Sequence, residues 1–134
     1  MYAHKATPGF DTIADSLLPG KQPWAKNAAV LIVAIARKTF EANNTANAYA
    51  IHDLGMANAH LLLQAHAFDI YCHTMAGFNK LKLAEEIKLS ENQEAVCVIA
   101  AGFLAPAETL QEPFKTRELT GRKRKNINEF TFKL

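Results

Sequence analysis

The stretch formed by residues 47–68 constrains the fold more than any other part of the chain. Its apolar residues recur at helical spacing and cover nearly the whole circumference of the helix they predict, and only Asp53 carries a formal charge. They are Ala48, Ile51, Leu54, Ala59, Leu62, Leu63, Ala65 and Ala67. A helix that is apolar all round must be covered on all sides, and the chain offers few elements to do so. We therefore predict a subunit interface along this helix.

Two long apolar runs predict strands at the centre of a sheet. Residues 28–36 contain no polar side chain, and residues 93–103 supply a second run rich in Val, Ile and Ala. Such runs are typical of strands that are buried on both faces. A shorter strand is expected over residues 70–74. The alternating end, Phe130-Thr131-Phe132, is compatible with one more strand, added either to its own sheet or to that of a partner.

Shorter helices separate these strands. Residues 10–18 place apolar side chains at helical spacing before Pro19-Gly20, and Pro23-Trp24 opens a brief turn or helix. Residues 75–78 predict a turn, and Asn79 is a plausible N-cap for a helix over residues 79–88. Strands that alternate with helices indicate an α/β or α+β class.

Size and charge limit the chain to a few classes. At 134 residues, with no visible linker, residues 1–134 are expected to form a single domain, and 49% hydrophobic content excludes intrinsic disorder. Residues 115–134 hold seven of the 15 Lys and Arg but two of the 13 Asp and Glu, giving +5 against −3 for the remainder. This basic end indicates a local anionic partner, namely a phosphate, a nucleic acid or an acidic protein patch.

The cysteines and the termini indicate a cytoplasmic protein. Cys72 and Cys97 form no Cys-x-x-Cys pair, so we expect neither a disulfide framework nor a cysteine zinc site. The first ten residues lack the layout of a signal peptide, and the longest apolar run, residues 28–36, is too short to cross a bilayer. We expect a reducing compartment and no membrane partner.

The polar residues of the apolar helix give no clear catalytic pattern. His52, His60 and His66 do not follow the spacing that puts two metal ligands on one helical face, so no metal site is predicted. His52 and Asp53 could form a catalytic pair, but adjacent helical side chains diverge by about 100°, which favours capping or interface hydrogen bonding. Neither serine lies in a Gly-x-Ser-x-Gly context, which disfavours acyl transfer.

The basic run of residues 122–125 admits three interpretations. A solvated charge run is the commonest, and a nucleic-acid patch is disfavoured because no aromatic residues are interleaved. The third is a phosphate clamp formed by Arg122 and Arg124, because guanidinium groups match phosphate oxygens in pairs. No glycine-rich phosphate loop of the Rossmann or P-loop type is present.

Five stretches, taken in their order and spacing, resemble one family over nearly the whole chain, from about Phe10 to the C-terminus. They are Trp24-Ala25-Lys26-Asn27-Ala28 leading into Val-Leu-Ile-Val, His52-Asp53-Leu54-Gly55-Met56-Ala57, residues 73–79, residues 96–103, and Arg122-Lys123-Arg124-Lys125 before Glu129-Phe130. Together they resemble the FMN-dependent nitroreductase-like flavoproteins.

This resemblance implies an α+β fold of the α/β sandwich type, with a mixed sheet and a long central helix at the interface of an intertwined homodimer. It implies one FMN per site, reduced by NAD(P)H, which passes electrons to a nitroaromatic or quinone-type small molecule in a ping-pong cycle. No nucleic acid and no catalytic side chain are expected. By resemblance, the flavin ring lies against the turn and the phosphate against two arginines, giving the cofactor-binding residues Thr74, Met75, Ala76, Gly77, Arg122 and Arg124.

The sequence also departs from the family pattern. Family members carry an N-terminal region with an Arg-x-Ser motif and an Asn-x-Gln-Pro-Trp segment, and neither is found here. Residues 1–4 resemble the strand that follows that region, and Lys21 stands where an asparagine is common. We therefore expect an N-terminally incomplete fold whose FMN affinity is weakened by several powers of ten through lost phosphate contacts. The alternative is a non-catalytic dimerising scaffold that has lost FMN.

Overall fold

The structure is a computed structural model that describes residues 1–134. The chain divides into two compact units, Met1–Leu104 and Ala105–Leu134, which we describe separately. No helix is both long and apolar enough to span a membrane.

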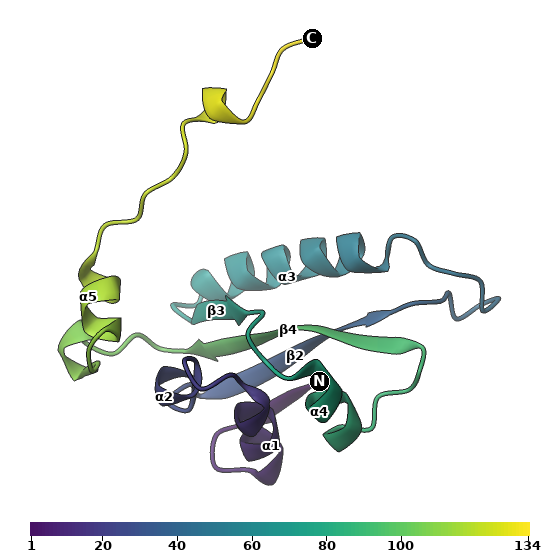
Figure 1. Cartoon of the computed structure of the whole chain (residues 1–134), viewed down its shortest axis with the longest axis horizontal. Coiled ribbons are helices and arrows are strands. Elements are labelled where there is room, and N and C mark those ends of the chain that lie inside the picture. The colour runs from purple at the N-terminus through teal and green to yellow at the C-terminus, as the bar shows by residue number, and fades with distance from the viewer. The chain divides into compact units, whose positions relative to one another are not determined.

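The first unit contains a four-stranded sheet in the order β1-β2-β4-β3 (Figure 1). The strands are β1 (Tyr2–His4), β2 (Val30–Arg37), β3 (Tyr71–Met75) and β4 (Gln93–Gly102). Every neighbouring pair is antiparallel, so the expected mixed sheet is wrong. The reason is that β2 and β3 run in the same direction but do not touch, because β4 lies between them and runs the opposite way. The expected strands over residues 28–36, 70–74 and 93–103 are confirmed with small shifts in their bounds.

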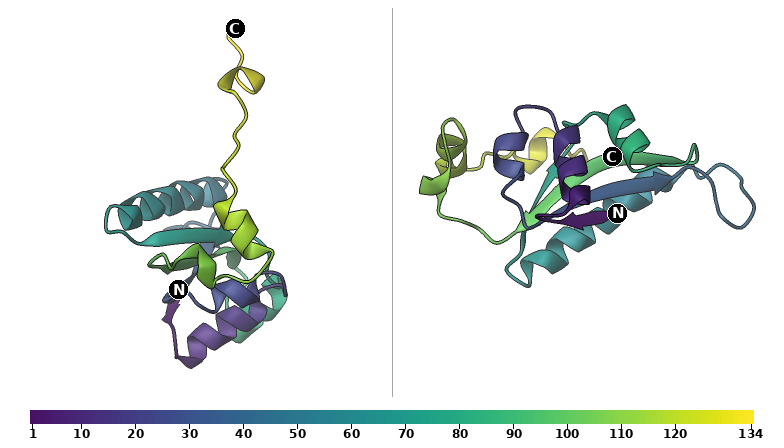
Figure 2. Two further views of the ribbon diagram at one scale, coloured as in Figure 1. Left: turned by 90° about the vertical axis from the view of Figure 1, so that its left-hand side faces the viewer. Right: turned by 90° about the horizontal axis from the view of Figure 1, so that it is seen from below.

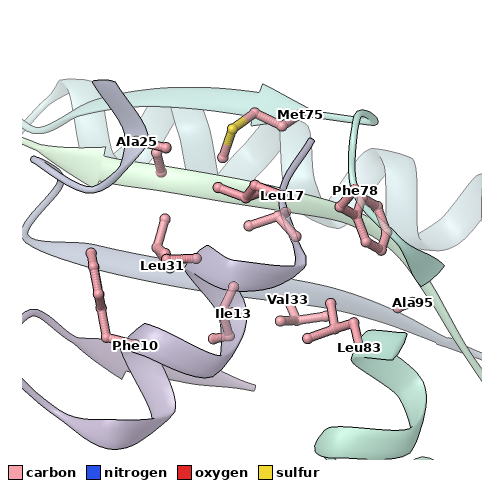
Figure 3. Packing of buried hydrophobic residues seen from close by; sticks show 13 residues of the cluster. Phe10, Ile13, Leu17, Ala25, Leu31, Val33, Met75, Phe78, Leu83 and Ala95 are labelled. Atoms are coloured by element: carbon pink, nitrogen blue, oxygen red, sulfur yellow. The ribbon is translucent and has the colours of Figure 1, made fainter. Parts of the chain in front are cut away.

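One face of the sheet is covered by short helices. These are α1 (Pro8–Ser16), α2 (Gln22–Ala25) and α4 (Lys80–Glu86). The Thr7 side chain caps α1, and the Asn79 side chain accepts a hydrogen bond of 3.0 Å from the Lys82 N–H, which confirms the expected N-cap. Their apolar faces meet the sheet in a cluster that Figure 3 shows from close by. It consists of Phe10, Ile13, Ala14, Leu17, Ala25, Leu31, Val33, Met75, Phe78, Leu83, Ala95, Val98 and Ala100.

The other face of the sheet is covered by α3 (Ala50–His66) alone (Figures 1 and 2). The expected long helix is confirmed, although it begins three residues later than predicted. A small cluster of Ala34, Cys97 and Ile99 lies beneath it, flanked by Leu54 and Leu62 of the helix itself. No residue of α3 is buried, and Ile51, Met56 and Leu63 are at least half exposed. The helix is thus apolar all round and covered on one side.

The second unit holds α5 (Phe114–Leu119) between two 3-10 helices, η1 (Ala107–Thr109) and η2 (Ile127–Glu129). No strand forms over residues 130–132, so this segment adds no strand to the chain's own sheet, and its addition to a partner's sheet stays a prediction. The physical reason lies in the turn before it. The Thr131 N–H and hydroxyl both bond to the Ile127 carbonyl, at 3.1 and 2.8 Å, which curls the backbone that an extended strand would need.

Candidate functional site: the turn between β3 and α4

The predicted flavin-binding residues of the first unit span the end of β3 and the connection to α4. Thr74 and Met75 are the last two residues of the strand, and Ala76 and Gly77 form the connection, so the expected turn begins one residue later than predicted. Met75 is 1% exposed and Phe78 is 7% exposed, and both side chains point into the large cluster (Figure 3). The two residues between them are therefore anchored on both sides by buried side chains.

Hydrogen bonds to the end of α1 hold the same connection from a second direction. The Leu18 N–H donates to the Gly77 carbonyl at 3.0 Å, and the Asn79 N–H donates to the Ser16 carbonyl at 2.7 Å. Leu17 and Phe78 form an isolated antiparallel bridge. Because packing and hydrogen bonds both fix its backbone, the turn is preorganised, as a binding site requires.

This turn presents hydrogen-bond donors that the chain does not use. The N–H groups of Ala76 and Gly77 donate no hydrogen bond within the protein, and the Thr74 hydroxyl makes none. Thr74 and Ala76 are exposed, and Gly77 is half-buried. Adjacent backbone N–H groups on a rigid turn can stabilise an acceptor atom or a developing negative charge on a ligand. The turn can therefore bind a ligand that is rich in acceptors.

Gly77 leaves space beside these donors without being required by the backbone. It does not adopt a positive φ angle. A Cβ atom placed on it would lie 3.4 Å from Cε of Lys21 and 3.5 Å from Cδ1 of Leu18, which are ordinary contacts. The fold of the turn thus tolerates alanine at this position, and glycine serves to keep the backbone accessible.

One aromatic contact beside the turn was not expected from the sequence. The Trp24 and His73 rings meet edge to face with centroids 4.6 Å apart, which packs α2 against β3. The two residues are 49 positions apart, and no sequence signal pairs them. The contact places Trp24 of α2 next to the strand that leads into Thr74.

The remaining predicted site residues, Arg122 and Arg124, belong to the second unit. Both are exposed, and Nη1 of Arg124 donates to the Lys123 carbonyl at 3.0 Å. No carboxylate forms an ion pair with either arginine, so both guanidinium groups are available to a phosphate. Their role in a phosphate clamp stays a prediction.

Other candidate groups are not part of the turn. The His52 Nδ1 and Asp53 Oδ1 atoms are 3.1 Å apart on the exposed side of α3, so the two adjacent side chains do meet despite their expected divergence. Both cysteines are free, and burial raises the pKa of each thiol. The chain brings together no group of three side chains able to hold a metal ion.

Comparison with known proteins points to one family. The model of the Nitroreductase family matches residues 3–103. A search of curated protein sequences found no significant match. Among solved structures, the chain is similar to an oxidoreductase containing FMN, with 28% identity and a TM-score of 0.91 over 98% of this chain and 68% of that one.

Two further structures share the fold at lower identity. The first is an FMN-dependent nitroreductase from Clostridium difficile R20291, with 19% identity and a TM-score of 0.63, covering 96% of this chain and 68% of that one. The second is a nitroreductase family protein from Streptococcus pneumoniae TIGR4, with 14% identity and a TM-score of 0.73, covering 100% of this chain and 77% of that one.

Proposed function

Because the chain belongs to the Nitroreductase family, we propose that it is an oxidoreductase that binds FMN at the turn formed by residues 74–77. The observation that carries this proposal is the pair of adjacent, unused N–H groups of Ala76 and Gly77 on a rigid, accessible turn. A flavin ring carries carbonyl and ring-nitrogen acceptors, so it fits the donors that this turn offers. The similar FMN-containing oxidoreductase supports the same cofactor.

In this proposal the turn of the first unit holds the flavin ring, and the phosphate clamp is the role that the resemblance implies for the two arginines. The turn orients the ring through the N–H groups of Ala76 and Gly77, and Thr74 and Met75 position that turn at the end of β3. Arg122 and Arg124 bind the phosphate through charge-assisted hydrogen bonds. The bound FMN supplies the redox chemistry, with NAD(P)H as donor and a nitroaromatic or quinone-type small molecule as acceptor. No side chain needs to act as a general acid or base.

A fluorescence titration of FMN with a glycine variant tests the turn. Gly77→Ala adds one methyl group that the fold tolerates, between Lys21 and Leu18 and next to the N–H groups proposed to bind the ring, so we expect FMN affinity to fall about tenfold, or roughly 1.4 kcal/mol. Gly20→Ala is the matched control, because a Cβ atom there meets nothing within 4 Å. Equal affinities in the two variants would remove the turn from the site. Failure of the wild-type chain to bind FMN would contradict the function itself.

A double variant tests the phosphate clamp. Replacing Arg122 and Arg124 with alanine removes two charge-assisted contacts worth about 1.5–3 kcal/mol each, so FMN affinity should fall by about a hundredfold or more. The control replaces Lys123 and Lys125 with alanine, which removes the same charge from the same run of residues. If both double variants lose affinity equally, the run acts through its overall charge and the clamp is wrong.

We further propose that the open sides of α3 form the interface of a homodimer. The helix exposes Ile51, Met56 and Leu63, the last at 70%, and an exposed apolar face of this kind marks an interaction surface. Leu63→Lys should convert a dimer into a monomer in light scattering. Leu81→Lys is the control, since Leu81 of α4 is 85% exposed on the other side of the sheet. A monomeric wild-type protein would contradict the proposal.

The same measurements separate the oxidoreductase from its alternative. A chain that dimerises but binds no FMN and oxidises no NAD(P)H with added FMN is the non-catalytic scaffold. A chain that binds FMN and oxidises NAD(P)H in the presence of a quinone is the oxidoreductase.

A further inference from the structure

The side chain of Lys21 lies against the candidate flavin turn. It comes from the loop between α1 and α2, where its N–H donates to the Leu18 carbonyl at 2.8 Å. Its Cε atom is 3.4 Å, and its Cγ atom 3.6 Å, from the point where a Cβ atom of Gly77 would stand. The aliphatic stem therefore packs along the glycine, and the ammonium group, one bond beyond Cε, lies beside the turn.

This ammonium group has no partner in the protein. Lys21 forms no ion pair, and its side chain makes no hydrogen bond. In contrast, Lys26, on the same stretch of chain, bonds to Asp15 at 3.1 Å, and Lys80 of α4 bonds to Glu94 at 3.2 Å. Lys21 is half-buried because its aliphatic stem packs along Gly77, and this packing holds the ammonium group beside the turn. The ammonium group is therefore placed to meet an anionic ligand that binds at the turn.

The surroundings match this expectation. The turn beside Lys21 offers the free N–H groups of Ala76 and Gly77. A cation and two adjacent unused donors together form an environment that favours negative charge. A ligand that becomes more negative during its reaction would be stabilised most where these groups lie.

We propose that Lys21 contacts the bound flavin electrostatically and stabilises the negative charge that the ring acquires when a hydride, two electrons with one proton, is transferred to it from NAD(P)H. This inference rests on the proposed FMN site at residues 74–77. By this inference, Lys21 raises the reduction potential of the bound FMN. The charge also explains what a lysine contributes that a neutral side chain at this position does not.

The test measures the reduction potential of FMN bound to three variants of the full chain, saturated with FMN and equilibrated with a reference dye. Lys21→Met keeps the stem and removes the charge, so the ratio of reduced to oxidised flavin should fall at least tenfold, which is about 30 mV for a two-electron couple. Lys21→Arg restores the charge and should stay within about threefold of the wild type, because both side chains are cationic. Lys26→Met is the control, and it should leave the ratio unchanged.

The outcomes separate this inference from the proposed function. If the wild-type chain holds no FMN, the proposed function fails, and the inference fails with it. If the wild type holds FMN and Lys21→Met has the wild-type potential, the inference is overturned while the function stands. A Lys21→Met protein that is folded by circular dichroism but no longer holds FMN would also overturn it, because Lys21 would then serve binding and not the potential.

Discussion

The two faces of the sheet are closed in different ways. On one face, three short helices bring side chains such as Phe10, Leu17 and Leu83 down onto Leu31 and Val33 of β2, and the result is a fully buried cluster. On the other face, a 17-residue helix buries none of its own residues and covers Ala34, Cys97 and Ile99.

The difference shows that helix length alone does not make a core. The short helices present one apolar face each, and that face is fully used. The long helix is apolar on several faces and uses one of them, through Leu54, Asn58 and Leu62. We infer that the first face stabilises the fold and that the second is available for assembly. Four predictions test this comparison.

The largest effect is expected in the large cluster beneath α1, α2 and α4. Leu31 is 0% exposed, so Leu31→Ala removes apolar contacts and leaves a cavity, and it should lower the free energy of unfolding by about 2–5 kcal/mol. Urea denaturation followed by circular dichroism measures this loss. A loss below 1 kcal/mol would show that this face collapses around the gap and is not tightly packed.

Replacing leucine with alanine on the face covered by α3 should lower the free energy of unfolding by less. Leu62 of α3 is half-buried against the small cluster, so Leu62→Ala removes less apolar area from the interior and should cost under about 2 kcal/mol in the same assay. A loss as large as that of Leu31→Ala would show that Leu62 is enclosed as tightly as the buried residues on the other face of the sheet, and a loss that depends on protein concentration would show that the dimer contributes to it.

Two asparagines allow the hydrogen bonds that hold α4 and α3 to be compared. Asn79 caps α4 by accepting from the Lys82 N–H, so Asn79→Ala should cost about 1 kcal/mol. The Asn58 amide reaches Cys97 Sγ at 3.6 Å, and sulfur is a weak acceptor, so Asn58→Ala should cost about 0.5 kcal/mol. Thermal unfolding of the two variants ranks them, and the reverse order would contradict the idea that α3 is the more loosely held helix.

The smallest effect concerns the Cys97 thiol, which lies beneath α3. Burial raises the pKa of Cys97 in the folded state, and the hydrogen bond from Asn58 opposes this in part. The folded protein therefore keeps the Cys97 proton to higher pH than the unfolded chain, so this contribution to stability is present at neutral pH and is lost as the pH rises above the ordinary thiol value of about 8.5. Urea titrations from pH 7 to 10 should show a shallower alkaline decline in Cys97→Ala. An identical decline would show that water reaches this thiol freely.

The sequence predicts the elements of the first unit well, because their signals are local. The β-branched run over residues 28–36, the cap at Asn79 and the helical spacing over residues 47–68 each depend on neighbours in the chain. The direction of the strands is not local. A strand, a helix and another strand suggest adjacent parallel strands, and only the pairing of β4 with both β2 and β3 shows that they are not adjacent.

The candidate site was predicted in part for a similar reason. The resemblance selected residues 74–77, and Gly77 indicated a close approach, but it did not show that two N–H groups in the turn are free. That depends on Leu18 and Ser16, which bond to the turn from some 60 residues earlier in the chain. The sequence marks Lys21 as an unusual residue, but its contact with Gly77 depends on how the loop after α1 packs.

The central place of β4 has a consequence for how the molecule is made. It is the last strand to be synthesised, yet β3 pairs with no other strand, and β2 has β4 as its longest partner. A nascent chain that ends before residue 93 therefore holds β3 and one side of β2 without their hydrogen-bonding partner, and exposed strand edges favour aggregation. The sheet closes only when Gln93–Gly102 emerges, so the rate of its formation is governed by contacts between residues far apart in the chain.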